Sequence, residues 1–340
     1  MILITGATGI VGSHILADLL AQNKRVRAMV RSESNRQAIE QLIRFRKLDT
    51  TNLFYVIGDV LDPASIQEAM LGCTEVYHCA ARISFRPKDK NMLFETNVHG
   101  TANVVDACLN EGIEMLCYIS STTALGDQTI EGKLKEESIW VSDKGRSGYS
   151  ISKRYSELEV WRGKQEGLNA VIVNPGIVIG AGNWGESSTS IILTCENGMR
   201  FFPSGSNGFV AATDVAKFCI ESMATGRFDQ RYVLIGENVS YKRLFSSITG
   251  EFGSPAPKFA LSKMIAEPAR MVLRALDLIG INPFTMTSEN LDSAYRKVVY
   301  NNERAKKTGF SFRLIDDAIK ETIAIYRSEK KSISLAQGPL

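Results

Sequence analysis

The spacing of apolar residues changes repeatedly along the first half of the chain. Residues 1–5 form an apolar run of strand length, and from residue 10 to residue 20 apolar side chains recur at helical spacing. Further strands are expected at 25–30, 53–57, 75–78, 115–121 and 170–174, and helices at 35–46, 90–111 and 149–163. Strands that alternate with helices predict an α/β fold: a doubly wound parallel sheet, or Rossmann fold, with helices on both faces.

The pattern loosens after residue 176 into loops rich in Gly and Ser, with a short strand at 231–235. We therefore expect a dinucleotide-binding core at 1–176 and a smaller, mainly substrate-binding lobe at 177–330, from which some segments return to the core. Residues 331–340 form the end of a polar tail that begins at Ser328 and is expected to be loosely held.

One stretch of the second half, 260–281, predicts an amphipathic helix with a break at Pro268. Its apolar stripe consists of Leu261, Met264, Ile265, Val272, Leu276 and Ile279. Two roles remain open for the stripe. It packs into the lobe as core, or part of it roofs the active site beside the phenylalanines Phe85, Phe201, Phe202 and Phe209.

The composition of the chain limits the kinds of molecule that the protein is expected to bind. The chain has 340 residues, of which 44% are hydrophobic, so it can bury a large core. Forty basic residues against 37 acidic ones argue against nucleic acid or an anionic membrane as a partner. No stretch is apolar enough to span a membrane, and the first strand leaves no room for a signal peptide. We expect a cytoplasmic protein with a small-molecule substrate, and a homodimer is left open.

The six cysteines are dispersed along the chain without a C-x-x-C pair. This spacing favours neither a disulfide framework nor a zinc site, and no other metal site is expected. Reduced thiols are the simplest interpretation, which agrees with a cytoplasmic location.

Three glycines follow the first strand, at Gly6, Gly9 and Gly12. This spacing suits a tight turn, the approach of a pyrophosphate to the backbone, and close packing of helix on strand. The helix that follows offers free N–H groups and a positive dipole end to phosphates. Such turns also occur without a ligand, but the strand before and the helix after favour dinucleotide binding.

A second pattern places Tyr149 and Lys153 four residues apart on one face of a predicted helix. A neighbouring ammonium stabilises phenolate, so we expect the pKa of Tyr149 to fall from about 10 toward neutrality. Such a tyrosine can donate a proton to a carbonyl or take one from an alcohol. Upstream, Ser120 and Ser121 end a predicted strand, where a hydroxyl can bond the reacting oxygen. By itself this spacing also fits an exposed helix pair.

In combination these motifs resemble the extended short-chain dehydrogenases/reductases, over residues 1–220. The matching segments, in the order in which that family has them, are residues 5–12, 58–60, 78–81, 97–101, 120–121, 149–153 and 174–176. The resemblance implies that Ser121, five residues before Gly126, is the catalytic hydroxyl and acts with Tyr149 and Lys153. Ser120 is the alternative.

The resemblance also implies a set of cofactor-binding residues at the strand ends. They are Gly6, Thr8, Gly9, Ile10, Val11, Gly12, Arg31, Asp59, Val60, Ala80, Ala81, Asn97, Tyr149, Lys153, Pro175, Gly176, Ile177 and Val178. Three positions keep a structural alternative: Asp59 could cap the next helix, Asn97 could hold backbone, and residues 174–176 could form a simple turn. For Asp214 a capping role is favoured over a reactive one.

The residue after the second strand discriminates between NAD and NADP. An acidic residue there binds the ribose 2′-hydroxyl, whereas arginine accommodates a 2′-phosphate. The strand is followed by Arg31, and no carboxylate occurs until Glu33. NADP is therefore preferred and NAD stays open, because Arg31 could also be an ordinary solvated arginine.

Three features distinguish between branches of the family. Sugar dehydratases carry Asp-Glu after the catalytic hydroxyl, where this chain has Thr122 and Thr123. Sugar-nucleotide epimerases grip the substrate pyrophosphate with arginine, but no basic residue lies between Arg200 and Asp214, and Asn174 stands where that group often has arginine.

The chain resembles instead the dihydroflavonol reductase and 3β-hydroxysteroid dehydrogenase branch. We therefore expect an NADP(H)-dependent oxidoreductase that reduces a ketone or aldehyde of a mostly apolar molecule. A nucleotide-sugar epimerase and a non-catalytic NADP-sensing regulator are the alternatives.

Overall fold

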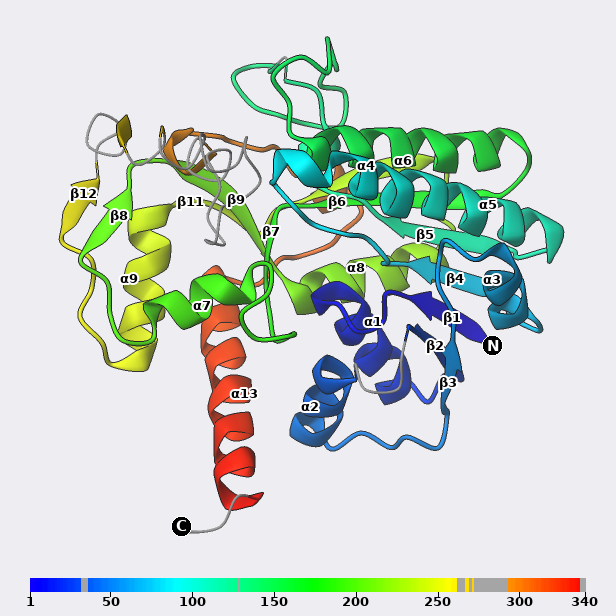
Figure 1. Ribbon diagram of the computed structural model, residues 1–340, viewed down its shortest axis with the longest axis horizontal. Coiled ribbons are helices and arrows are strands. Elements are labelled where there is room, and N and C mark those ends of the chain that lie inside the picture. Colours follow the sequence, from blue (N-terminus) through cyan, green and yellow to red (C-terminus); the bar gives the residue numbers. More distant parts are fainter. Residues whose placement is uncertain (32–35, 128, 262–266, 269–270, 272–292, 337–340) are drawn as a thin grey trace.

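A seven-stranded parallel sheet forms the centre of the computed structural model (Figure 1). The structure describes residues 1–31, 36–127, 129–261, 267–268, 271 and 293–336. The strands lie in the order β10-β6-β5-β4-β1-β2-β3. Their bounds are β1 (Ile2–Thr5), β2 (Val26–Val30), β3 (Leu53–Ile57), β4 (Glu75–His78), β5 (Met115–Ile119), β6 (Asn169–Pro175) and β10 (Gln230–Leu234). The strand order reverses between β1 and β4, and the end of such a switch point is where ligands of this fold class bind.

Helices cover both faces of the sheet, as the alternating pattern predicts (Figure 1). One face carries α1 (Ile10–Ala21), α2 (Gln37–Arg46) and α8 (Ala212–Ala224), which share one apolar core with the sheet. The other carries α3 (Pro63–Met70), α5 (Gly100–Asn110) and α6 (Gly148–Gln165), which share a second. The doubly wound Rossmann fold is therefore confirmed.

The helix expected at 90–111 is interrupted. It consists of α4 (Lys90–Leu93), a π-helical turn, η2 (Phe94–His99), and α5, preceded by a short 3-10 turn, η1 (Pro87–Asp89). A π-helical turn inserts an extra residue into a helix and often marks a functional position. Here it carries Asn97, which is 1% exposed.

The second half forms a smaller lobe beside the sheet (Figure 1). Its elements are β7 (Ile177–Ile179), α7 (Thr189–Cys195), β8 (Phe201–Pro203), β9 (Ser206–Ala211), β11 (Glu237–Ser240), α9 (Tyr241–Phe252), β12 (Phe259–Leu261) and α13 (Ile315–Ala336). The expected strand at 231–235 is β10, which joins the edge of the central sheet against β6, and α8 packs on α1. A short helix, α12 (Glu303–Lys306), lies against β10.

The end of the chain differs from the expectation. Instead of a loose tail from Ser328, α13 continues to Ala336. Glu329 is 7% exposed and accepts hydrogen bonds from Gln37 Nε2 at 2.9 Å and Trp184 Nε1 at 2.5 Å. The expectation of a loose tail is therefore wrong at its beginning, because the buried Glu329 carboxylate with its two donors ties this helix to α2 and the 180–186 loop. Residues 331–336 continue the helix, and how loosely they are held stays a prediction.

The predicted amphipathic helix at 260–281 falls mostly outside the described residues. Leu261 ends β12, and the other members of the apolar stripe are not among the residues that the structure describes. In the part of the chain that is described, no helix is both long enough and apolar enough to cross a membrane.

Candidate active site

The glycine-rich turn after β1 has the geometry that a dinucleotide pyrophosphate requires. Gly6 has a φ of +65°, and a Cβ there would lie 2.5 Å from the Ala80 nitrogen. A Cβ on Gly12 would lie 2.3 Å from the Gly6 carbonyl oxygen. Gly9, in contrast, is exposed, and among the described residues no side chain caps α1. Gly6 and Gly12 thus permit close packing, while Gly9 leaves the amide end of α1 open to phosphates.

The other predicted cofactor residues lie along the same edge of the sheet. Thr8, Ile10 and Val11 are partly exposed at the start of α1, and Arg31 is exposed directly after β2. Ala80 is partly exposed and Ala81 exposed, beyond the end of β4.

At the end of β3, Asp59 accepts a hydrogen bond from the Leu61 amide at 2.9 Å. The cap of α3 is Asp62, whose carboxylate accepts from the Ala64 amide, so Asp59 does not have the capping role held open for it. Val60 is 5% exposed and packs into the core against Gly100. Any contact of Val60 with an adenine ring would therefore involve mainly its backbone.

A buried polar chain joins β1, β4 and α5 beneath this edge. Thr5 Oγ1 and His78 Nδ1 are 2.7 Å apart, and His78 Nε2 and Thr101 Oγ1 are 3.0 Å apart. Burial lowers the pKa of His78 to about 3, so its imidazole is neutral. Residues 78–81 match the family pattern, but the match gives His78 no role. In the structure, the two hydrogen bonds of its imidazole fix the end of β4, which leads to Ala80.

Asn97 binds the backbone of Arg82, which is one of the two roles that the sequence left open for it. Its amide accepts from the Arg82 N–H at 2.7 Å and donates to the Arg82 carbonyl at 3.0 Å and to Ser152 Oγ at 2.9 Å. These bonds fix the segment that continues from Ala81. Direct contact between Asn97 and a cofactor stays a prediction.

Tyr149 lies in the first turn of α6, which Ser147 caps by accepting from the Ser150 amide at 3.0 Å. The Tyr149 ring packs edge-on against Phe85 with centroids 5.7 Å apart, and its hydroxyl lies near the Ser121 side chain. Burial raises the pKa of Tyr149 to about 12, and the nearby Ser121 hydroxyl opposes part of that rise. The expectation of a pKa near neutrality is wrong, because burial is the larger effect.

Lys153 shares the buried face of α6 with Tyr149, but its ammonium is bonded elsewhere. Its Nζ donates to the Ile119 carbonyl at 2.7 Å and to the Tyr118 hydroxyl at 3.1 Å. Burial lowers the pKa of Lys153 to about 8, while the Glu157 carboxylate opposes this fall. Sequence reasoning did not identify Tyr118 or Glu157; the place of Glu157, four residues after Lys153, was the available signal.

The structure distinguishes the two candidate serines. Ser120 Oγ is buried and donates to Glu157 Oε1 at 2.6 Å. The Ser121 hydroxyl accepts from the Thr123 amide at 3.2 Å and from the Thr123 hydroxyl at 3.0 Å, and it lies near Tyr149. Ser121 is therefore the serine that the fold brings to the tyrosine.

Residues 175–178 cross from the sheet to the small lobe. Pro175 ends β6, the Gly176 amide donates to the Leu234 carbonyl at 3.1 Å, and Ile177 and Val178 are partly buried in β7. A Cβ on Gly176 would lie 2.4 Å from the Gly208 carbonyl oxygen. The segment is thus more than a simple turn, since it joins two sheets.

Asp214 has a structural role, but it is not the capping role expected of it, because no side chain among the described residues caps α8. It lies in the first turn of α8 and accepts a hydrogen bond from the Arg313 amide at 2.8 Å. Its carboxylate thereby ties the segment before α13 to α8.

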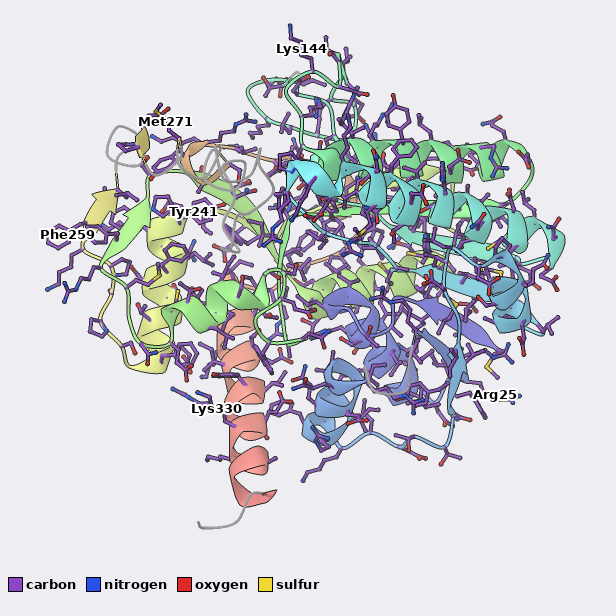
Figure 2. All side chains as sticks on the ribbon, in the orientation of Figure 1. Arg25, Lys144, Tyr241, Phe259, Met271 and Lys330 are labelled. Atoms are coloured by element: carbon purple, nitrogen blue, oxygen red, sulfur yellow. The ribbon has the colours of Figure 1, made fainter. Side chains whose placement is uncertain are left out.

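The four phenylalanines considered for a roof over the site do not gather there. Phe209 is fully buried in the lobe, edge-on against Tyr241, and Phe202 is 9% exposed. Phe201 is 53% exposed and pairs with Phe259 on the outer edge of the lobe, where Figure 2 shows Phe259 projecting outward. Phe85 is the one of the four that packs on Tyr149, because the strands of the small lobe direct the others elsewhere.

Residues 2–234 match the model of the NAD dependent epimerase/dehydratase family, which covers more than half of the chain. The chain belongs to this family. It is therefore an NAD(P)-dependent enzyme of the class that acts on CH–OH or carbonyl groups. The family assignment agrees with the open glycine turn and with Tyr149 at the carboxyl edge of the sheet.

Among curated relatives of this epimerase/dehydratase family member, sterol demethylase protein B of Methylococcus capsulatus is 30% identical over 76% of each chain. A putative dihydroflavonol 4-reductase of Synechocystis is also 30% identical, over 75% of this chain and 73% of its own. The crystal structure of gox2253 superposes with a TM-score of 0.80 and 30% identity over 97% of this chain and 98% of that one. A UDP-glucose 4-epimerase of Thermus thermophilus, 20% identical with a TM-score of 0.72, shares the fold.

Proposed function

We propose that this enzyme is an NADP(H)-dependent reductase of a ketone or aldehyde on a mostly apolar small molecule. The observation that carries the proposal is that the Ser121 and Tyr149 side chains lie close together, at the sheet edge that also holds the open glycine turn. A phenol and a second hydroxyl that meet in this way can address one substrate oxygen together.

The proposed roles follow from the environment of each group. When bound, a reduced nicotinamide supplies the hydride. Tyr149, whose pKa burial raises to about 12, is a neutral phenol at pH 7, the form that donates a proton to an oxygen gaining negative charge. The Ser121 hydroxyl polarises the carbonyl. Lys153, whose Nζ donates to the Ile119 carbonyl and the Tyr118 hydroxyl, would act on Tyr149 by its charge from one helical turn away and would hold the nicotinamide ribose once a cofactor is bound.

The absence of cations in one segment supports an apolar substrate. No Lys or Arg lies between Arg200 and Asp214, a stretch that forms β8 and β9. A buried pyrophosphate without a cationic partner is strongly disfavoured. The names of the two curated relatives at 30% identity, sterol demethylase protein B and a putative dihydroflavonol 4-reductase, agree with this class of substrate.

The position of Arg31 supports NADPH as the cofactor. Arg31 is exposed at the end of β2, next to the strand that carries the glycine turn, where a 2′-phosphate would be received. We expect NADPH to bind more tightly than NADH by about 1–3 kcal/mol, the contribution of a hydrogen bond to a charged group. Fluorescence titration measures both affinities, and Arg31→Ala should abolish the difference. Equal affinities in the unmodified enzyme would exclude this role.

A substrate screen tests the reaction. Aromatic and alicyclic ketones and aldehydes should drive NADPH oxidation, recorded by absorbance, whereas UDP-sugars should not. UDP-sugars are examined in parallel by NMR for interconversion without net use of cofactor. Efficient epimerisation would overturn the reductase proposal in favour of the nucleotide-sugar epimerase, and cofactor binding without any turnover would favour a regulator.

We also propose a cytoplasmic location and a small-molecule substrate as the main partner. All six cysteines are free thiols in the structure, and five of them are buried, which supports a reducing compartment. Fractionation of cells that express a tagged chain tests the location. Sedimentation equilibrium of the purified chain distinguishes a monomer from a homodimer.

A further inference from the structure

Glu157 is a fully buried carboxylate on α6, one turn beyond Lys153. Its Oε1 accepts from Ser120 Oγ at 2.6 Å and from Asn174 Nδ2 at 2.5 Å, and its Oε2 accepts from Arg231 at 2.9 Å. The three donors come from the end of β5, from β6 and from β10. One carboxylate thus binds three neighbouring strands of the sheet to the helix that carries Tyr149.

The buried charge is compensated by a cation that is itself held in place. Arg231 is 14% exposed and donates through Nε to the Glu136 carbonyl at 2.9 Å. The Glu136 carboxylate in turn accepts from the Val233 amide at 2.8 Å. An unpaired buried carboxylate is strongly disfavoured, and the pairing with Arg231 offsets the cost of burying Glu157.

Asn174 connects Glu157 to the catalytic serine. Its Nδ2 donates to Glu157 and also to the Ser121 carbonyl at 2.9 Å. Both of these partners are acceptors, so the amide can point only one way. Its Oδ1 is buried without a hydrogen-bond partner among the described residues, which makes this orientation costly to maintain.

Residues 119–121 are therefore held by one side-chain partner each, through the backbone carbonyls of Ile119 and Ser121 and the hydroxyl of Ser120. Lys153 bonds the Ile119 carbonyl, Glu157 bonds the Ser120 hydroxyl, and Asn174 bonds the Ser121 carbonyl. We propose that Glu157 is a positioning residue for the reaction proposed above: through Ser120 and Asn174 it fixes the backbone of Ser121, so that the Ser121 hydroxyl meets Tyr149.

The same carboxylate also acts on Lys153 by its charge, which raises the pKa of the buried ammonium. The other groups that face Lys153 are His78 and Cys79 at the end of β4, Tyr118 on β5, and Tyr149 on its own helix. Removal of the negative charge should therefore shift the alkaline limb of the kcat profile to lower pH.

The test compares Glu157→Gln with Glu159→Gln in the full chain. Glu159 lies two residues further along α6, is 29% exposed and pairs with Arg162 at 2.9 Å, so it controls for the loss of a carboxylate on this helix. For Glu157→Gln we expect kcat to fall about 10- to 100-fold, with KM and NADPH affinity little changed, because a displaced catalytic group slows the chemical step. Glu159→Gln should leave kcat and its pH profile unchanged.

A second measurement does not depend on the proposed reaction. Hydrogen–deuterium exchange of peptides that span residues 119–125 should be faster in Glu157→Gln than in the unmodified chain or in Glu159→Gln. Faster exchange in a protein that reduces none of the carbonyl compounds would retain the positioning role and reject the proposed function. The two proposals can thus fail separately.

Unchanged kcat, pH profile and exchange in a folded Glu157→Gln would overturn the inference, even if thermal stability fell. If Glu157→Gln does not fold, Ser120→Ala removes one of the same bonds without leaving an unpaired donor cation. It should lower kcat about 3- to 10-fold and speed exchange in residues 119–125, since a small displacement suffices to slow the reaction. No change in either measurement would then overturn the proposal.

Discussion

The carboxyl edge of the central sheet and the outer edge of the small lobe are constructed in opposite ways. Beneath α6, Lys153 and Glu157 are both buried, and each is hydrogen-bonded to a neighbouring strand end. At the outer edge of the lobe, Phe201 and Phe259 are 53% and 60% exposed and meet as a tilted ring pair with centroids 6.0 Å apart. Figure 1 shows the two regions on opposite sides of β7 and β9.

The difference reflects what each kind of contact specifies. A buried charge or amide must find partners of fixed direction, so a polar network permits few arrangements of the strand ends. Contacts between exposed rings are weakly directional and tolerate changes in shape. The sheet edge is therefore suited to hold reacting groups in place, whereas the outer edge of the lobe tolerates changes in shape.

The largest effect on turnover is expected from Tyr149→Phe, at the carboxyl edge of the central sheet. Loss of the hydroxyl removes the proton donor but leaves the ring against Phe85. We expect turnover to fall about two to four orders of magnitude, with NADPH affinity nearly unchanged. Steady-state kinetics and a binding titration measure the two quantities. A variant that retains most of its turnover would show that another group supplies the proton.

A comparison of the kcat values of Ser121→Ala and Ser120→Ala tests which of the two serines acts with Tyr149. The Ser121 hydroxyl lies near Tyr149, so its loss should lower kcat about 100-fold, as does removal of one oxyanion donor in other enzymes. Ser120 bonds Glu157, and its loss should cost less. If Ser120→Ala has the larger effect on kcat, the two serines have been assigned in the wrong order.

The buried imidazole predicts a pH dependence of stability. His78 has a pKa of about 3 in the folded protein, below its ordinary value of 6.5. As the pH falls, His78 therefore takes up a proton in the unfolded chain before it does so in the folded chain. The stability that neutral His78 contributes is present above pH 6.5 and is lost as the pH falls toward 3. Between pH 6 and pH 5 this group should lower the free energy of unfolding by about 1 kcal/mol.

Urea unfolding at pH 6 and pH 5 measures that change. His78→Gln should flatten the pH dependence, although it also loses stability at pH 7. His99→Gln, at an exposed histidine, is the matched control and should keep the slope of the unmodified chain. His14 is buried with a lowered pKa and contributes to the slope in all three proteins. An unchanged slope in His78→Gln would mean that His78 is not the titrating group.

The smallest effect is expected at the outer edge of the lobe. Phe259→Ala removes one ring of the exposed pair and should change the free energy of unfolding by less than about 1 kcal/mol. Thermal or urea unfolding measures it, and carbonyl reduction should continue. A loss above about 2 kcal/mol would show that this edge is packed like a core, and would remove the contrast between the two regions.

Much of the site can be predicted from local patterns. The glycine turn follows from three residues and their flanking strand and helix, and the shared face of Tyr149 and Lys153 follows from their spacing of four. Other features needed the structure. The alternating pattern did not indicate α13, whose place depends on bonds from Gln37 and Trp184, residues about 290 and 145 positions away from Glu329 in the sequence.

The sequence by itself determined the type and order of most elements in the first half, and hence the sheet edge at which the candidate residues lie; α3 and the interruption of the helix at 90–111 were not among the predictions. Apolar periodicity encodes this information locally, because each strand or helix must bury one face. Only the tertiary structure decided that Ser121 rather than Ser120 meets Tyr149, that Lys153 is bonded to Ile119, and that burial raises the pKa of Tyr149. Those outcomes depend on which strand ends lie side by side and how deeply they are buried, and neither is set by the spacing of residues within one element.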